Sequence, residues 1–265
     1  MSSIAYHRPA SAAQAAQLSA GDPDSKLLAG GQSIVPSLKL GLLAPSALID
    51  LTGIPELRGI RLQGRTLTVG AMTTHAVVAH SPEVRSSIPA LARLAEGIGD
   101  RQVRNRGTAG GSLANSDPAA DYPAAALGLG AVLRTTRRTI AADAFFKGLF
   151  ETALEPGELL TAVEFPVPEA AAYVKHPQPA SRFALVGVFV SRAGNEVRVA
   201  VTGAASCVFR VREMEDALAK RFAPQSLAGI GVAAQTLNGD IHGSAEYRAH
   251  LIPVLARQAV AQALG

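Results

Sequence analysis

The sequence predicts an α+β protein with a small N-terminal α/β unit, a larger second lobe and a C-terminal domain of sheet and helices. Helix and strand patterns alternate over residues 1–52, alternating apolar runs joined by short turns begin near residue 57, and two long apolar runs precede helical patterns in the C-terminal third. We therefore expect a first domain at 1–167, with lobes at about 1–55 and 56–167, and a second domain at 168–265.

The N-terminal unit is predicted from three short patterns. "SAAQAAQLSAG" predicts a helix that Ser11 caps and Gly21 ends. "SKLLA" predicts a buried strand that stops at Gly30 and Gly31, and "SALIDL" predicts a second strand beside the first.

The second lobe is predicted to contain β-hairpins. "LRGIRLQGRTLTVGAM" predicts two strands around a turn at Gln63 and Gly64, and "AVLRTTRRTI" predicts a second hairpin. "SSIPALARLAEGIG" and "DYPAAALGLG" predict helices, and "GELLTAVEFPVP" predicts a closing strand. Pro166 and Pro168 mark the expected boundary.

The C-terminal domain is expected to be a sheet covered by helices. "RFALVGVFVSRAGNEVRVAVTGAA" predicts two long strands joined by a Gly-Asn turn, and helical material is expected from Arg212 onward. Cys207 follows a strand, and we expect it to be a small buried apolar residue.

Composition excludes several classes of function. The 265 residues include one cysteine, so the chain alone cannot form a disulfide, an iron–sulfur cluster or a thiolate zinc site. The net charge is +4, but the arginines are scattered and lack interleaved aromatic residues, which argues against nucleic acid. No apolar run is long enough for a membrane span, and "MSSIAYHRPASAAQ" lacks the order of a signal peptide, so we expect a cytoplasmic protein.

The two glycine segments are predicted to be loops, and they are the candidate binding elements. After a strand, "AGGQS" exposes backbone N–H groups without a Cβ, although such a turn is more often simply structural. "TAGGSLANSDPAAD" repeats the pattern, and Thr108, Ser112 and Asn115 can donate to phosphate or ribose oxygens. Two such segments fit a long ligand with a diphosphate, such as a dinucleotide. Neither matches G-x-G-x-x-G, and the chain contains no P-loop.

No catalytic or metal-binding residues are expected in this chain. Its six histidines lie far apart without metal-ligand spacing, which favours structural or solvent-facing roles. Asp117 is expected to cap a helix and Asp121 to contact the bound ligand. Arg101, Arg104 and Arg106 either steady the adjacent segment, face a partner or form a solvated basic face.

The stretches "LLAGGQSIVPSLKLGLLAPSALIDL" and "IGDRQVRNRGTAGGSLANSDPAADYPAA" resemble the flavin subunit of molybdenum hydroxylases, the medium subunit of carbon monoxide dehydrogenase-type and xanthine dehydrogenase-type enzymes. The resemblance covers nearly the whole chain. It implies a two-lobed FAD-binding domain of the vanillyl-alcohol oxidase (PCMH) type, followed by a C-terminal sheet-and-helix domain.

The resemblance also implies which residues bind FAD. Phe183 stands where some members place a tyrosine near the flavin ring, and many relatives have Asn in place of Ser112. The implied FAD-binding residues are Leu27, Leu28, Ala29, Gly30, Gly31, Gln32, Ser33 and Ile34 in the first segment, Thr108, Ala109, Gly110, Gly111 and Ser112 in the second, and Ile98, Asn115, Asp121, Leu160 and Lys175 elsewhere.

The function implied by the resemblance is electron transfer within a complex. A large molybdopterin subunit and a small iron–sulfur subunit would carry the molybdenum cofactor and the [2Fe-2S] clusters, and FAD would pass electrons to NAD, oxygen, a quinone or a carrier protein. The FAD should be noncovalent, because neither glycine segment contains His or Cys. A stand-alone flavin oxidase of related fold and a nucleotide-binding or assembly module without a redox role are the alternatives.

Overall fold

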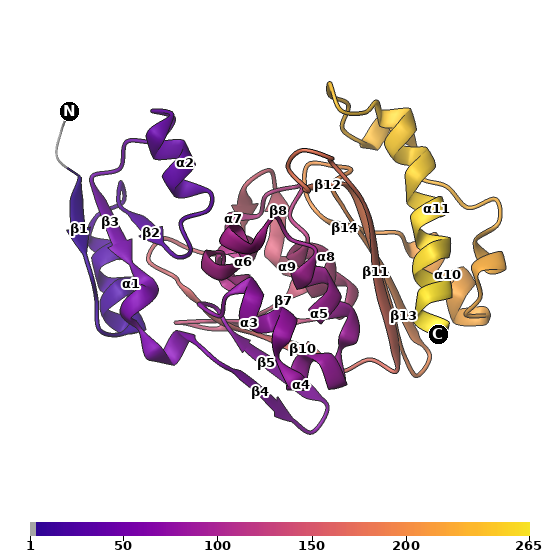
Figure 1. Cartoon of the computed structure of the whole chain (residues 1–265), viewed down its shortest axis with the longest axis horizontal. Helices are drawn as coiled ribbons and strands as arrows, with labels where there is room; N and C mark the ends of the chain where they lie inside the picture. The colour runs from indigo at the N-terminus through magenta and orange to yellow at the C-terminus, as the bar shows by residue number, and fades with distance from the viewer. Residues whose placement is uncertain (1–3) are drawn as a thin grey trace.

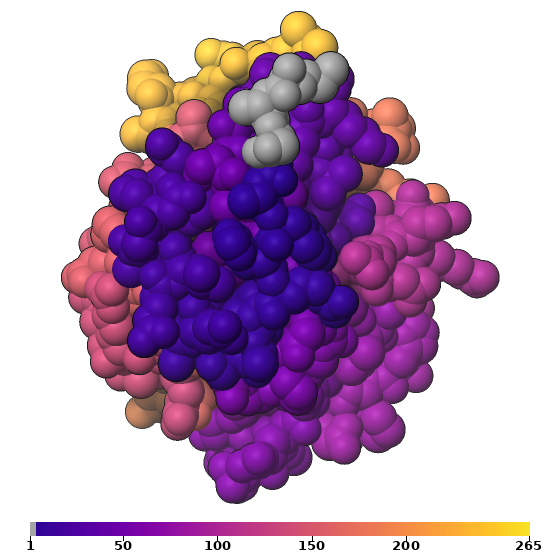
Figure 2. All heavy atoms as spheres, turned by 90° about the vertical axis from the view of Figure 1, so that its left-hand side faces the viewer, coloured from indigo at the N-terminus to yellow at the C-terminus, as the bar shows by residue number. Residues whose placement is uncertain are grey.

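Residues 4–265 are described by a computed structural model, in which three sheets follow one another along the molecule (Figure 1). The first sheet is parallel, in the order β1-β3-β2. Helix α1 packs against β3, and helix α2 follows β2. Seen from the end, this N-terminal unit lies in front of the rest of the molecule (Figure 2). Its elements are β1 (Ala5–His7), α1 (Ala12–Gly21), β2 (Lys26–Leu28), α2 (Ile34–Lys39) and β3 (Ala47–Asp50).

The second sheet is antiparallel, in the order β4-β5-β10-β6-β7. Both hairpins predicted from the sequence are present in it, because β4 pairs with β5 and β6 pairs with β7. Its strands are β4 (Ile60–Gln63), β5 (Thr66–Gly70), β6 (Val132–Thr135), β7 (Thr139–Ala141) and β10 (Leu160–Pro166).

A layer of short helices separates the second sheet from the third. Helices α4 and α7 pack on the second sheet, whereas α5 and α8 contact strands of the third. The helices are α3 (His75–His80), α4 (Pro82–Ser87), α5 (Pro89–Glu96), α6 (Arg101–Arg106), α7 (Ala109–Asn115), α8 (Tyr122–Gly128) and α9 (Ala142–Phe145). A two-stranded ribbon of β8 (Phe146–Gly148) and β9 (Glu151–Thr152) comes after α9.

The third sheet is antiparallel, in the order β11-β12-β13-β14, and α10 and α11 contact it (Figure 1). The predicted Gly-Asn turn joins β12 to β13. The elements are β11 (Ala170–Pro177), β12 (Ala184–Ala193), β13 (Glu196–Thr202), β14 (Phe209–Arg210), α10 (Arg212–Lys220) and α11 (Ala245–Leu264).

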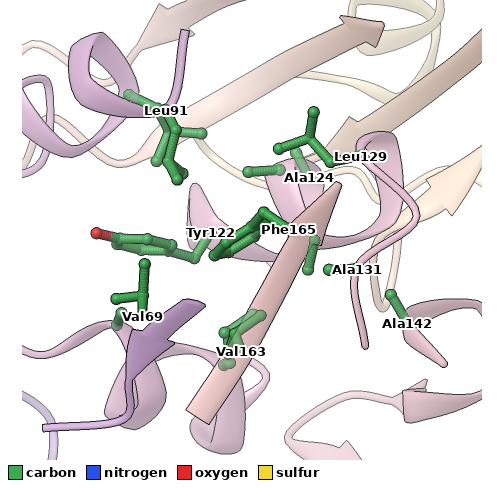
Figure 3. Packing of buried hydrophobic residues seen from close by; sticks show 14 of the residues in the cluster. Val69, Leu91, Tyr122, Ala124, Leu129, Ala131, Ala142, Val163 and Phe165 are labelled. Atoms are coloured by element: carbon green, nitrogen blue, oxygen red, sulfur yellow. The ribbon is translucent and has the colours of Figure 1, made fainter. Parts of the chain in front are cut away.

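The largest apolar core lies between the second sheet and the helical layer. The Tyr122 ring lies between Leu91 and Val69, with Phe165 beside it (Figure 3). Phe189 of β12 is fully buried in the same core, so the third sheet is packed onto the helical layer. Burying such large side chains contributes roughly 1.5–3 kcal/mol each to folding.

Several sequence predictions need correction. Strand β2 is not buried, since Lys26 is exposed and Leu27 and Leu28 are half-buried at the edge of a small sheet. Helical structure from Arg212 onward is interrupted, because α10 ends at Lys220 and short 3-10 turns and loops precede α11. Cys207 is partly exposed in the loop before β14.

No helix within residues 4–265 combines the length and the apolar character needed to cross a membrane.

Glu158 ties the segment before β10 to the β6–β7 hairpin. Its side chain has no exposed surface, and its two oxygens accept from Arg138 at 3.0 Å each. Thr135 and the backbone of Glu155 also donate to it. The hydrogen bonds from Arg138 are the main reason that the pKa of Glu158 falls from 4.5 to about 2.

We expect Glu158→Gln to destabilise the protein in a pH-dependent way. A lowered folded-state pKa adds stability that is complete above the unfolded-state value and is lost as the pH falls toward about 2. The loss at pH 7 should be on the order of 2 kcal/mol and should shrink between pH 5 and 3, as measured by urea unfolding. Glu155→Gln is the control, because that half-exposed side chain pairs with Arg137 and Arg138 at the surface and should cost much less.

Candidate cofactor site

The first glycine segment is a turn between β2 and α2. Gly31 has a φ of +75°, a left-handed conformation that glycine adopts readily. The backbone N–H groups of residues 30–34 donate to no other residue within 4–265, and the first N–H bonded into α2 is that of Val35, which donates to Gly31. The turn therefore presents a row of free backbone donors at the surface, as an anionic oxygen requires.

The second glycine segment is the start of a helix, where the sequence suggested a loop. Thr108 caps α7 by accepting a hydrogen bond from the N–H of Gly111 at 3.1 Å. The N–H groups of Ala109, Gly110 and Ser112 donate to Thr73, Ala71 and Thr108. The capping threonine outweighs the low helix propensity of the two glycines.

Side chains, rather than backbone groups, are the donors that this helix offers to a ligand. Ser112 and Asn115 are half-buried, and their polar side-chain atoms make no hydrogen bond with any residue in 4–265. Their spacing of three residues places them on one face of α7. Both sequence-predicted residues are therefore free to donate.

The two glycine segments lie against each other. A Cβ at Gly30 would lie 2.2 Å from the carbonyl oxygen of Arg106 and 2.7 Å from the Cα of Gly107. A Cβ at Gly111 would lie 3.2 Å from the Cβ of Ala29. The turn and the start of α7 thus form one continuous feature, although they are some eighty residues apart in the sequence.

Leu160 is linked to the second segment through Ala71. Leu160 is buried at the start of β10 and belongs to the central core. Ala71 accepts a hydrogen bond from Gly110 and donates one to Thr161, the neighbour of Leu160.

Lys175 links Asp121 to the segment that contains Ile98. Lys175 Nζ lies 2.9 Å from Asp121 Oδ1 and donates to the carbonyl oxygen of Gly97, next to half-buried Ile98. Tyr173 also donates to Asp121, at 2.6 Å. Burial raises the pKa of the Asp121 carboxyl, and the nearby ammonium and hydroxyl oppose this effect.

The family model described as "FAD binding domain in molybdopterin dehydrogenase" matches residues 2–168. The chain belongs to this family. The match includes both glycine segments, and it confirms the resemblance inferred from them.

Relatives and solved structures match this chain over almost its whole length. It is 36% identical to the nicotine 6-hydroxylase medium subunit of Paenarthrobacter nicotinovorans, covering 98% of this chain and 97% of that one. It is 39% identical to the carbon monoxide dehydrogenase medium chain of Hydrogenophaga pseudoflava, covering 96% and 95%. The structure of carbon monoxide dehydrogenase from Hydrogenophaga pseudoflava matches with a TM-score of 0.89 at 34% identity, over 98% of this chain and 97% of that one. Quinoline 2-oxidoreductase from Pseudomonas putida 86 matches with a TM-score of 0.87 at 31% identity, over 98% and 96%.

As a member of this FAD-binding family, the chain is an oxidoreductase subunit with a mixed α/β fold of the carbon monoxide dehydrogenase medium-subunit kind. FAD is the cofactor that the resemblance predicted, and the family match supports it. Within residues 4–265, no group of three or more His, Cys, Asp or Glu side chains is arranged to hold a metal ion.

In this flavoprotein, a buried histidine supports the second segment, whereas the sequence predicted structural or solvent-facing histidines without singling out this one. His75 is 5% exposed, its backbone N–H donates to Gly107, and its ring stacks on Tyr122 with centroids 5.3 Å apart. Burial and the nearby Arg104 lower the pKa of His75 to about 4. A Cβ at Gly107 would lie 2.7 Å from its Nε2. Only this packing reveals the role, because no motif surrounds the histidine.

The contacts of Asp117 and Arg104 show what these two side chains do. The Asp117 side chain accepts from the N–H of Ala119 and so holds a turn, whereas the helix cap was expected there. Arg104 donates to the carbonyl oxygens of Ile98 and Gly99, so this arginine steadies the adjacent turn.

We expect Gly110→Ala to destabilise the protein even without a ligand. The added Cβ would lie 2.4 Å from the Ala71 Cβ, so the backbone would have to shift at a cost of about 2 kcal/mol. Gly21→Ala in α1 is the control, because its Cβ would meet nothing within 4 Å and alanine favours a helix. Urea unfolding of the cofactor-free proteins measures both, and equal stability of the two variants would contradict the packing role of Gly110.

Proposed function

We propose that this chain is the FAD-carrying electron-transfer subunit of a molybdenum hydroxylase complex. The main observation behind this proposal is the row of free backbone N–H groups at residues 30–34, which lies beside the segment that contains Ser112 and Asn115. Medium subunits of such complexes also match this chain over nearly its full length. Such an arrangement suits the diphosphate of FAD, whose oxygens accept several hydrogen bonds at once.

Different parts of the candidate site would supply different kinds of contact to FAD. The turn from Leu27 to Ile34 supplies backbone donors, while the start of α7, from Thr108 to Ser112, supplies side-chain donors and close packing. Asn115 extends the polar face of α7. Ile98 and Leu160 supply apolar surface, and Asp121 and Lys175 supply the polar pair near Ile98.

In its bound form FAD supplies the redox chemistry, and this chain binds it, orients it and shields it. The FAD is held without a covalent bond in this proposal, since the residues of both glycine segments lack a suitable nucleophile. The positive net charge of +4 favours association with an anionic cofactor and with acidic partners.

The proposal includes a two-lobed FAD domain and a separate C-terminal domain. The first sheet supports a lobe ending near residue 55, whose small core also includes Met72 and Leu159 of the second lobe, and the second sheet supports a lobe ending near residue 167. The third sheet, with α10 and α11, has a core of its own and supports a C-terminal domain at 168–265.

Partner subunits complete the proposed complex. Relatives are named medium subunits or medium chains, and a large molybdopterin subunit and a small iron–sulfur subunit would hold the molybdenum cofactor and the [2Fe-2S] clusters. Electrons would then pass through FAD to NAD, oxygen, a quinone or a carrier protein. The cytoplasmic location inferred from the sequence stays a prediction.

Purification of the chain alone tests the function. We expect a yellow protein whose flavin is released by acid precipitation and which, alone, does not oxidise an alcohol, an aldehyde or an N-heterocycle. Co-expression with the two partner subunits should then give substrate-dependent flavin bleaching. A protein that takes up no FAD would contradict the proposal, and turnover by the chain alone would favour a self-contained flavin oxidase.

We expect Ser112→Asp to weaken FAD binding. A carboxylate at this half-buried position would repel the diphosphate and raise the dissociation constant by on the order of tenfold or more. Ser112→Asn is the matched control, because an amide of the same size keeps a donor without the charge. Titration of the cofactor-free proteins by flavin fluorescence measures both, and equal affinities would place the diphosphate elsewhere.

A further inference from the structure

The Lys175 ammonium is fully occupied within the protein. Nζ lies 2.9 Å from Asp121 Oδ1, donates to the carbonyl oxygen of Gly97 at 3.0 Å and donates to that of Arg182 at 2.9 Å. An ammonium group has three protons, so these three acceptors use its whole donor set. No donor remains for a cofactor.

The two carbonyl groups each belong to the residue directly before a candidate flavin contact. Gly97 precedes Ile98, which the resemblance places against the cofactor, and Arg182 precedes Phe183, which stands where some members place a tyrosine near the flavin ring. Ile98 is half-buried between α5 and α6, and Phe183 is 48% exposed just before β12. One ammonium therefore joins the backbone at both positions.

Further contacts fasten the same two segments. The Arg182 guanidinium donates to the carbonyl oxygen of Gly99 at 3.2 Å, while its backbone has a φ of +62°. The N–H of Arg182 donates to Gln178, and that of Gln178 donates to Phe183, which closes the loop between β11 and β12. Among residues 4–265, Lys175 is the one group that bonds this loop, the turn at 97–99 and the start of α8 together.

Asp121 supplies the counter-charge that keeps the ammonium in place. Its side chain is 4% exposed and it also accepts from Tyr173. A buried carboxylate without a partner is strongly destabilising, so the pair acts as a unit.

We infer that Lys175 is a positioning residue for the flavin: its ammonium fixes Ile98 and Phe183 relative to each other through the carbonyl groups that precede them, and it makes no hydrogen bond of its own to FAD. The inference rests on the proposed function. It assigns Lys175 an indirect role, whereas the resemblance implied a direct cofactor contact.

Trypsin digestion of the cofactor-free chain tests the fixing of the loop. Lys175→Met keeps the length of the side chain but loses all three bonds, so cleavage after Arg182 should become about tenfold faster. Lys220→Met is the matched control, because Lys220 is an exposed lysine at the end of α10. An unchanged cleavage rate in Lys175→Met would overturn the inference.

Flavin binding tests the indirect role. In Lys175→Met, the FAD dissociation constant should stay within about threefold, since the proposed diphosphate donors are untouched. The resolved shoulders of the visible flavin band should broaden and the midpoint potential should shift, because the ring would lose its fixed surroundings. An affinity loss on the order of a hundredfold, with trypsin cleavage unchanged, would show a direct contact and overturn the inference.

A double variant keeps the test valid if Lys175→Met folds poorly. Lys175→Met with Asp121→Asn removes both charges, so no unpaired carboxylate stays buried, and it should show the same faster cleavage and broadened flavin band. A wild-type chain that binds no FAD would overturn the proposed function, and the trypsin comparison would still report whether Lys175 fixes the loop.

Discussion

The close approach of Gly30 to the backbone of residues 106 and 107 is the constraint on which the candidate site depends. With a Cβ 2.2 Å from the Arg106 carbonyl oxygen, no other residue could let the two segments touch. Hydrogen bonds hold the second glycine segment in place, because Gly107 accepts from His75 and Gly110 donates to Ala71 beside the second sheet. The position of the β2–α2 turn is therefore set by the core of a different sheet.

The candidate site offers two kinds of hydrogen-bond donor, the backbone N–H groups of residues 30–34 and the side chains on α7. The N–H groups of α7 are satisfied within the chain, so that helix start is rigid before any ligand arrives. Those of residues 30–34 are free and lie in a half-buried or exposed turn, where water satisfies them in the absence of a ligand. Phosphate oxygens would replace that water without breaking any bond inside the protein.

Local chemistry explains which features could be predicted from the sequence. Turn residues such as Gly64 and Gly194 specify hairpins, and Ser11 specifies a helix start, since each acts through neighbours in the chain. The second glycine segment was predicted as a loop because two glycines disfavour a helix, yet Thr108 and the contact with Ala71 hold it helical. The His75 and Tyr122 stack joins residues far apart in the sequence, and nothing local to either residue specifies it.

The pairing of Asp121 with Lys175 shows why a charged pair is placed where apolar side chains would pack well. Two apolar residues could fill the same space, and removing both charges together is often neutral for stability. Apolar residues would, however, leave the carbonyl oxygens of Gly97 and Arg182 without the donor that they now share. Both residues are exposed, so water would then bind their carbonyl oxygens and the two segments would be free to shift. The ion pair therefore matters less for net stability than for holding two turns from different parts of the chain in one fixed relation.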